Sequence, residues 1–176
     1  MKQYIQPFIN VCKNVFKDFV NLELEAKLPY FMQKEMASEW DISGVIGLTG
    51  EARGAVVISM KQDLALKLTA ILTGTEHKNF DADVVDAVGE IINIIAGNAK
   101  QELEESFRLV ISLPTIVKGK EHSVNWPEDQ ARIICIPFIV CDTEDSFTLS
   151  VALEAVKNTG KLYTEAEDSR HINKRG

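Results

Sequence analysis

The stretch "DAVGEIINIIAGNAK", residues 86–100, places one carboxylate and one amide inside the most apolar run of the chain. Glu90 and Asn93 are three residues apart, and isoleucines stand on both sides of Asn93. Gly89 and Gly97 interrupt a pattern that is otherwise helical. Two glycines and an asparagine inside a helix destabilise it by roughly 2 kcal/mol relative to alanines. We therefore expect these residues to serve a purpose other than helix stability.

A helical wheel separates this stretch into a polar stripe and a buried remainder. The helix is expected to begin at a cap formed by Asp81 or Asp83 and to run to about Phe107. Its polar stripe, within an arc of roughly 100°, contains Asp83, Asp86, Glu90, Asn93, Gly97, Lys100, Gln101 and Glu104. The side chains expected to be buried are Val84, Val85, Val88, Ile91, Ile92 and Ile95. Asn93 thus has isoleucines around it in sequence but is predicted to be exposed, with Gly97 leaving bare backbone one turn further on.

Apolar periodicity predicts two more helices, at 6–20 and 62–73, and strands elsewhere. The buried face of the first helix is expected to contain Phe8, Ile9, Cys12, Val15, Phe16 and Phe19. That of the second is expected to contain Leu64, Leu68, Ile71 and Leu72. Strands are expected at 21–28, in a hairpin over 41–60 that turns near Gly50 to Gly54, and at 109–119, 131–141 and 146–156.

This order of elements predicts an α+β domain (mixed α/β) and not an alternating βαβ chain. A mostly antiparallel sheet would pack against the N-terminal helix and the long central helix. Pro137, inside a strand pattern, indicates a sheet edge or a bulge. The single domain would cover residues 1–156, and the polar residues 157–176 are expected to form a disordered tail. No helix follows the glycines of the hairpin, as a phosphate-binding loop would require, so we interpret as turn and close-packing residues Gly44, Gly47, Gly50 and Gly54.

Composition argues against several classes of function. The 176 residues are 45% apolar and 26% charged, which is typical of a globular protein. The formal net charge of -7 argues against nucleic-acid binding, which needs a basic face. No apolar run reaches the roughly 18 residues of a membrane span. The N-terminus lacks the apolar core of a signal peptide, so we expect a cytoplasmic protein.

The cysteines and histidines form no recognisable metal or redox motif. The three cysteines have no CxxC spacing and are expected to be buried, reduced thiols: Cys12, Cys135 and Cys141. The three histidines are scattered among polar segments: His77, His122 and His171. Because the usual ligand spacings are missing, we expect no metal site.

The residues alone leave two ordinary interpretations of the polar stripe open. It can be the solvated face of an amphipathic helix whose glycines allow tight packing against the sheet. Alternatively, Asn93 can fix the register of a helix pair in a dimer, as single polar residues do.

A wider pattern favours a third interpretation. Asp86, Glu90 and Asn93 have the spacing Asp, three residues, Glu, two residues, Asn, and "IIAGNAK" follows. Further segments of the same kind are "QPFINVCKNVF", "DISGVIGLTGEARGAVVIS" and "SLPTIVKGK". The combination resembles the CheC/CheX/FliY family of chemotaxis phosphatases, specifically its CheX-like members, over nearly all of residues 1–154. CheC-type relatives have two Glu-x-x-Asn sets, whereas this chain has one.

The resemblance implies an enzyme that removes the aspartyl phosphate from a CheY-type chemotaxis response regulator. Asn93 would be inserted in trans to orient the hydrolytic water, while Glu90 would dock on a cation of the regulator. The protein would need no cofactor of its own, because the Mg²⁺ is bound by the regulator. Members with a single set are also expected to be homodimers.

Four further residues of the stripe are candidates for contact with the regulator. Asp86 is interpreted as a rim contact or as a charge favourable to the helix dipole. Gly97 would let the partner approach closely. Lys100 and Gln101 also lie on the stripe, and for them a solvated helix face is at least as good an interpretation.

Two alternatives to the phosphatase remain. A non-catalytic binding module could use the same stripe to dock on a response regulator or a flagellar switch component. A metal hydrolase built on Glu90 and Asp86 is disfavoured, because no histidine is positioned nearby.

Overall fold

The computed structural model describes residues 2–32, 39–104, 108–120 and 132–156 and the single positions 122, 124 and 126. Its helices are α1 (Lys2–Val20), α2 (Gln62–Thr73) and α3 (Ala82–Leu103). Its strands are β1 (Leu24–Ala26), β2 (Tyr30–Phe31), β3 (Ile42–Gly50), β4 (Ala52–Met60), β5 (Leu109–Ile111), β6 (Thr115–Lys118), β7 (Ile134–Val140) and β8 (Ser146–Ala155). The predicted tail at 157–176 and the expected helix end at Phe107 lie outside the described residues.

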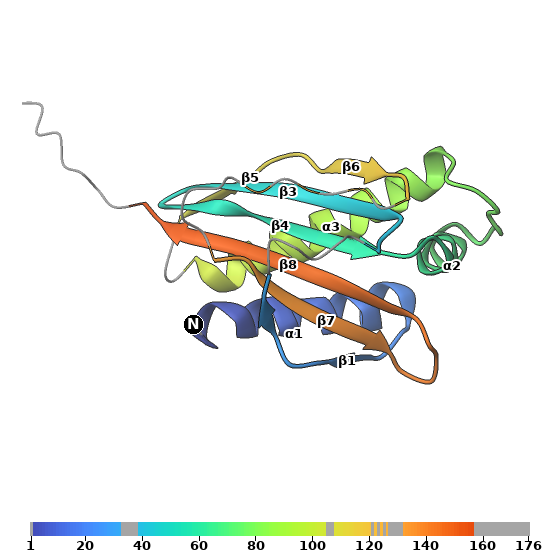
Figure 1. Cartoon of the computed structure of the whole chain (residues 1–176), viewed down its shortest axis with the longest axis horizontal. Coiled ribbons are helices and arrows are strands. Elements are labelled where there is room, and N and C mark those ends of the chain that lie inside the picture. The colour runs from blue at the N-terminus through green and yellow to red at the C-terminus, as the bar shows by residue number, and fades with distance from the viewer. Residues whose placement is uncertain are drawn as a thin grey trace, which may run out of the picture.

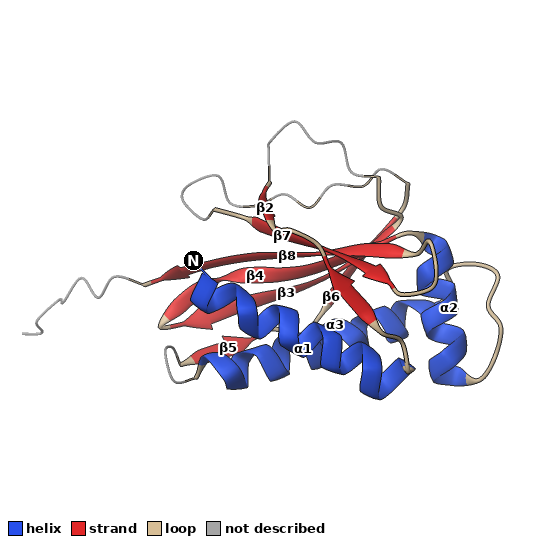
Figure 2. Cartoon of the chain, turned by 90° about the horizontal axis from the view of Figure 1, so that it is seen from below, coloured by secondary structure: helices blue, strands red, loops and turns tan. Residues whose placement is uncertain are grey.

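One sheet organises the molecule, and all pairings between its described strands are antiparallel. The strand order is β1-β7-β8-β4-β3-β5, with β2 also paired to β7 and β6 also paired to β3. The three helices cover one face of this sheet (Figures 1 and 2). The predicted α+β class with a mostly antiparallel sheet is therefore confirmed. None of the described helices is long and apolar enough to cross a membrane.

The hairpin of β3 and β4 and its glycines are as predicted. The two strands pair from Ile42 opposite Met60 to Leu48 opposite Gly54. Gly50 has φ of +123°, a backbone conformation that favours glycine at the turn. Gly54 lies against the backbone of β8, where a β-carbon would overlap the carbonyl oxygen of Ala152. These glycines therefore serve turning and close packing.

Helix α1 begins at Lys2, earlier than the predicted residue 6. Its buried side chains are Ile5, Phe8, Val11, Cys12, Val15, Phe16 and Val20. Phe16 stacks on Phe147 of β8 with ring centroids 4.7 Å apart, and Phe147 stacks on Phe138 of β7 at 5.1 Å. The prediction that Phe19 is buried was wrong, since it is 53% exposed. The buried face continues through Val20 instead of Phe19.

Helix α2 has the predicted bounds and ends at Gly74, whose φ of 71° is left-handed. Its buried residues are Leu64, Ala65, Leu68 and Thr69. The predicted burial of Ile71 and Leu72 was wrong, because they are 46% and 39% exposed. Both lie in the last turn of the helix, beyond the turns that the core covers.

Two predictions need refinement, one about Pro137 in β7 and one about the cysteines. Strand β7 is not the outermost strand, yet Pro137 lies between the segments covered by β1 and β2. The carbonyl of Pro137 accepts a hydrogen bond from the Lys27 N–H at 2.8 Å. In an antiparallel strand the N–H and the C=O of one residue point to the same side. The N–H that proline lacks would therefore have faced the gap between β1 and β2, so its absence removes no hydrogen bond to either strand.

Cys12 and Cys135 are buried as predicted, but the prediction for Cys141 was wrong, since it is exposed at the turn after β7.

Candidate active site

The N-terminus of α3 is fixed by a side-chain cap. The carboxylate of Asp81 accepts a hydrogen bond from the Val84 N–H at 3.0 Å, so Asp81 is the cap and Asp83 is not. Its other oxygen lies 2.8 Å from Nδ1 of His77, whose Nε2 lies 3.2 Å from the Thr73 hydroxyl. The hydrogen bond to His77, together with that from Val84, holds the pKa of Asp81 below its usual value. This chain of contacts joins the end of α2 to the start of α3.

Helix α3 presents its polar stripe outward while its other faces are packed. It contacts α1, α2 and strands β3 to β6. Its buried residues are Val84, Ala87, Val88, Gly89, Ile91, Ile92, Ile95, Ala96, Ala99 and Leu103. Val85, predicted to be buried, is half-buried. It stands beside the stripe, at the edge of the open surface described below.

The stripe faces outward as predicted, except that Asn93, expected to be exposed, is half-buried at the edge of the depression described below. Asp86, Glu90 and Gln101 are exposed, and Asn93 is half-buried. Lys100 is half-buried and pairs with Glu104 across one turn at 3.4 Å. Within the part of the chain that the structure describes, neither Glu90 nor Asn93 makes a hydrogen bond or an ion pair. The carboxylate and the amide, one turn apart, are therefore available to another molecule.

An open depression adjoins these two side chains. It is lined by Val85, Asp86, Gly89, Glu90, Asn93, Pro114 and Ile116. The helix contributes the polar rim, whereas Pro114 and Ile116 at the start of β6 contribute an apolar wall. A β-carbon on Gly89 would lie 3.7 Å from both Pro114 and Ile116. Gly89 thus keeps the floor of the depression open without being needed to avoid a clash.

Sequence reasoning missed the wall of this depression. Pro114 and Ile116 reach α3 because β6 pairs with β3, with Gly44 opposite Ile116. The segment "SLPTIVKGK" was recognised as part of the family pattern, but no local periodicity indicates which helix it faces. Gly97 was predicted correctly to leave a bare surface, since no atom lies within 4 Å of the position of its missing β-carbon.

Three residues with metal-binding atoms lie close together at the start of α3 and in the segment before it. Atoms of His77, Asp81 and Asp83 lie within 4.8 Å of one another. In this geometry His77 and Asp81 bond to each other, and Asp81 also caps the helix. None of the three lines the depression beside Glu90 and Asn93. This arrangement offers no support for a metal hydrolase built on Glu90 and Asp86.

Comparison with known proteins identifies the family. A family model described as "Chemotaxis phosphatase CheX" matches residues 42–138, more than half of the chain. The chain belongs to the CheX family of chemotaxis phosphatases. The resemblance inferred from the sequence is confirmed, and membership makes the protein a phosphatase, that is, a hydrolase.

Individual CheX proteins agree with this assignment in sequence and in fold. The CheY-P phosphatase CheX of Thermotoga maritima is 31% identical over 113 residues, which cover 63% of this chain and 70% of that protein. The crystal structure of CheX from Vibrio vulnificus has a TM-score of 0.77 at 31% identity and covers 86% of this chain and 99% of that one. A CheX–CheY–BeF3–Mg²⁺ complex from Borrelia burgdorferi has a TM-score of 0.73 at 25% identity, covering 86% and 97%.

Proposed function

We propose that this CheX-family protein hydrolyses the aspartyl phosphate of a CheY-type response regulator. The Thermotoga relative is named as a CheY-P phosphatase, and the Borrelia relative forms a complex with CheY, BeF3 and Mg²⁺. One observation on this chain carries the proposal. Glu90 and Asn93 stand one turn apart at the edge of an open depression, with no partner among the described residues.

Asn93 orients the attacking water. Its carboxamide oxygen accepts a hydrogen bond from water and its nitrogen donates one, and the group is neutral, so the phosphoryl oxygens do not repel it. Phosphoryl transfer depends mainly on positioning and electrostatic stabilisation. The buried neighbours Ile91 and Ile92 anchor the helix backbone on both sides of the stripe, which limits the positions that the amide can take.

Glu90 docks the regulator. Its exposed carboxylate pairs with a cation of the partner and fixes the register in which Asn93 enters the partner's cleft. A carboxylate at the position of Asn93 could not replace the amide, because it would be repelled by the phosphoryl group. The two side chains therefore have separate roles, one in affinity and orientation and one in the reaction.

The surrounding stripe completes the contact surface. Asp86 lies at the rim of the depression, Gln101 extends the stripe, and Lys100 reaches the partner if it leaves Glu104. Gly97 allows the partner's backbone to approach the helix. The regulator brings the Mg²⁺ that neutralises its phosphate, so the protein supplies half of an active site and no metal of its own.

The decisive experiment measures phosphate release from a phosphorylated CheY-type regulator with Mg²⁺. Wild type should accelerate release, and Asn93→Ala should lower the acceleration on the order of 10²-fold, as loss of one preorganised polar group does elsewhere, while regulator binding persists. Glu90→Ala should lower the acceleration and should also weaken binding of the regulator. Asn98→Ala is the matched control, because Asn98 is exposed on the same helix but lies off the stripe.

The non-catalytic alternative makes the opposite prediction. A binding module would bind the regulator, but neither wild type nor Asn93→Ala would change the rate of phosphate release. Binding without acceleration would therefore overturn the proposed activity and leave the stripe as a docking surface.

We also propose that the protein is a cytoplasmic homodimer whose subunits pair through sheet edges. The edge formed by β5 and β6 supports this, since Val110 is 63% exposed there and Leu113, between the two strands, is 86% exposed. Unpaired strand edges with apolar side chains favour association. Light scattering should give twice the monomer mass of 19.6 kDa.

We also propose that the phosphatase domain ends at residue 156. A chain truncated after that residue should retain the phosphatase activity, and loss of activity would contradict this boundary.

A further inference from the structure

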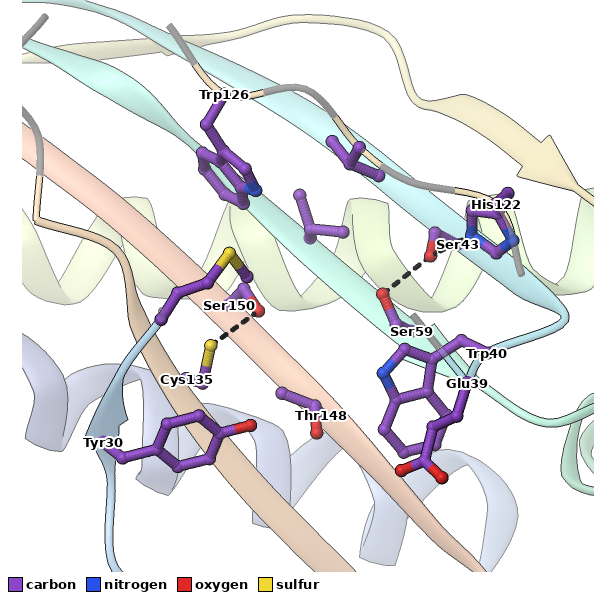
Figure 3. Close-up of a pocket in the computed structure, with 13 residues that line it drawn as sticks. Tyr30, Glu39, Trp40, Ser43, Ser59, His122, Trp126, Cys135, Thr148 and Ser150 are labelled. Atoms are coloured by element: carbon purple, nitrogen blue, oxygen red, sulfur yellow. Dashed lines mark hydrogen bonds between the residues drawn. The ribbon is translucent and has the colours of Figure 1, made fainter. Parts of the chain in front are cut away.

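The face of the sheet opposite the helices carries a second site. A cavity of about 150 Å³ lies over β3, β4, β7 and β8, and Figure 3 shows the helices behind the sheet and the lining side chains in front of it. We propose that this cavity binds a small organic cation, of the size of choline. The proposal is independent of the phosphatase reaction, because no residue of the α3 stripe lines the cavity.

The floor of the cavity is built from hydroxyl groups on the strands. Ser43 and Ser59 are 1% and 8% exposed, and their oxygens lie 2.7 Å apart. Nε2 of His122 lies 2.7 Å from the Ser43 oxygen, and Nδ1 lies 2.9 Å from the Gly119 carbonyl oxygen. Because a carbonyl only accepts, this network assigns the proton to Nδ1, and a neutral ring then accepts from Ser43. With the ring neutral, Ser43 accepts from Ser59, and the hydroxyl oxygens of the floor keep acceptor lone pairs.

The hydroxyl of Thr148 has no hydrogen-bond partner among the residues that the structure describes. The residue is only 6% exposed, and no hydrogen bond joins its side chain to another described residue. Among the described residues no side-chain polar atom is both sealed from solvent and unpaired, so the Thr148 oxygen must face the cavity. In Figure 3 it lies between the Tyr30 hydroxyl and the side chains of Glu39 and Trp40. A polar group of a ligand in the cavity can hydrogen-bond to this hydroxyl in place of water.

The walls favour a positive charge. Trp40, Trp126 and Tyr30 surround the cavity, and the Glu39 carboxylate lies at its rim (Figure 3). No lysine or arginine is among the described lining residues. Lys61 donates its hydrogen bond to the backbone carbonyl of Glu39 and leaves the carboxylate unpaired within the described chain. Aromatic faces attract cations, tryptophan most strongly, whereas an anion would meet only the carboxylate.

The environment of Tyr30 supports this arrangement. Burial, the contact with Cys135 and the negative charge of Glu39 together raise the pKa of the Tyr30 hydroxyl. The Glu39 carboxylate therefore acts on the same space as the ring. A cavity of this volume is comparable to one that accepts benzene in an engineered protein, which limits the ligand to a single small ammonium group with a short chain.

Tryptophan fluorescence tests the site directly, because the chain has two tryptophans and both line the cavity. Purified full-length protein is titrated with choline and with the neutral isostere in which carbon replaces the choline nitrogen. We expect a saturable change in emission with choline and at least a roughly tenfold weaker response with the isostere. No saturable response to choline overturns the proposal. An equal response to both compounds also overturns it, since charge would then not be recognised.

Two variants locate the binding. Thr148→Val removes the unpaired hydroxyl with little change in shape, and Glu39→Gln removes the rim charge. Each should raise the apparent dissociation constant for choline by roughly tenfold, a typical loss for a hydrogen bond or close charge in a partly buried site. Thr49→Val, at an exposed threonine of β3, should bind like wild type, and so should Asn93→Ala. Wild-type affinity in both Thr148→Val and Glu39→Gln would exclude this cavity as the site.

Discussion

Gly44 of β3 lies directly against Ile92 of α3, where a β-carbon on Gly44 would come 3.0 Å from Cγ2 of Ile92. The same β-carbon would lie 3.4 Å from side-chain atoms of Ile58 and Ile116. Ile92 precedes Asn93, and Ile116 forms part of the depression beside it. One glycine therefore sets the distance between the sheet and the helix that carries the proposed catalytic amide.

Gly44→Ala should destabilise the protein and displace α3. Overpacking a core costs about 1–3 kcal/mol, and the loss of unfolded-chain freedom offsets about 0.4–1 kcal/mol of it. We expect a net loss of about 1 kcal/mol in the free energy of unfolding, measured by urea denaturation, and slower regulator dephosphorylation. Gly47→Ala is the control on the same strand, since its β-carbon would make only an ordinary contact, 3.6 Å from the Ser112 hydroxyl. Equal stability of the two variants would contradict this account.

Part of the loss of folding stability at acid pH should come from protonation of Asp81. Its pKa in the folded protein is lowered, chiefly by the hydrogen bond to His77 and then by that from Val84. Its contribution is therefore complete above the unfolded-state pKa near 3.8 and is lost as the pH falls through the lower folded-state value. Asp81→Asn keeps an acceptor for the helix cap but removes the charge.

Urea midpoints measured between about pH 6 and pH 3 distinguish the two parts of this effect. Asp81→Ala should be less stable than wild type throughout, because it lacks the cap. Asp81→Asn should be less stable near pH 6 and should approach wild type as the pH falls. A difference between wild type and Asp81→Asn that does not change with pH would show that the carboxylate charge has no role.

Local sequence patterns predicted where the helices and strands lie better than they predicted which residues near the ends of these elements are buried. The wheel placed Glu90 and Asn93 on the exposed side of α3 because period and polarity are local properties. Phe19 and Leu72 were misassigned because burial near a helix end depends on how far the packed neighbours extend, which the helix's own sequence does not encode. Cys141 was misassigned for a related reason, since it follows the last residue of β7 and lies in a turn.

Long-range pairing explains what the sequence did not reveal about the sites. The wall of the depression exists because β6 returns to pair with β3, some seventy residues earlier in the chain. Likewise, Ser43, Thr148 and Trp126 come from distant segments, and each is unremarkable in its own sequence context. The family pattern identified the catalytic candidates, whereas the second cavity required the three-dimensional arrangement.

The thiols should separate into one reactive and two protected groups. Cys141 is exposed, whereas Cys12 and Cys135 are buried. Burial raises the pKa of the Cys12 thiol, and it also raises that of Cys135 despite hydrogen bonds to Ser150 and Tyr30. Because the thiolate is the reactive form, a chromogenic disulfide reagent should titrate one thiol in the native protein and three in denaturant. Cys141→Ser should abolish the native reaction, and a persistent fast reaction in that variant would contradict the assignment.

Gly97 should trade stability against activity. Its missing β-carbon would meet no atom within 4 Å, so Gly97→Ala should stabilise the helix by about 1 kcal/mol. If the regulator approaches the bare backbone there, the new methyl group should lower kcat/KM for dephosphorylation by about tenfold, equivalent to about 1.4 kcal/mol.

Gly89→Ala should give a similar gain in stability, since its contacts of 3.7 Å are ordinary, but it would narrow the depression and also slow the reaction. Asn98→Ala, off the stripe, should leave kcat/KM unchanged. Full activity in both glycine variants, with the expected rise in urea midpoint, would show that the regulator does not dock on this face of α3.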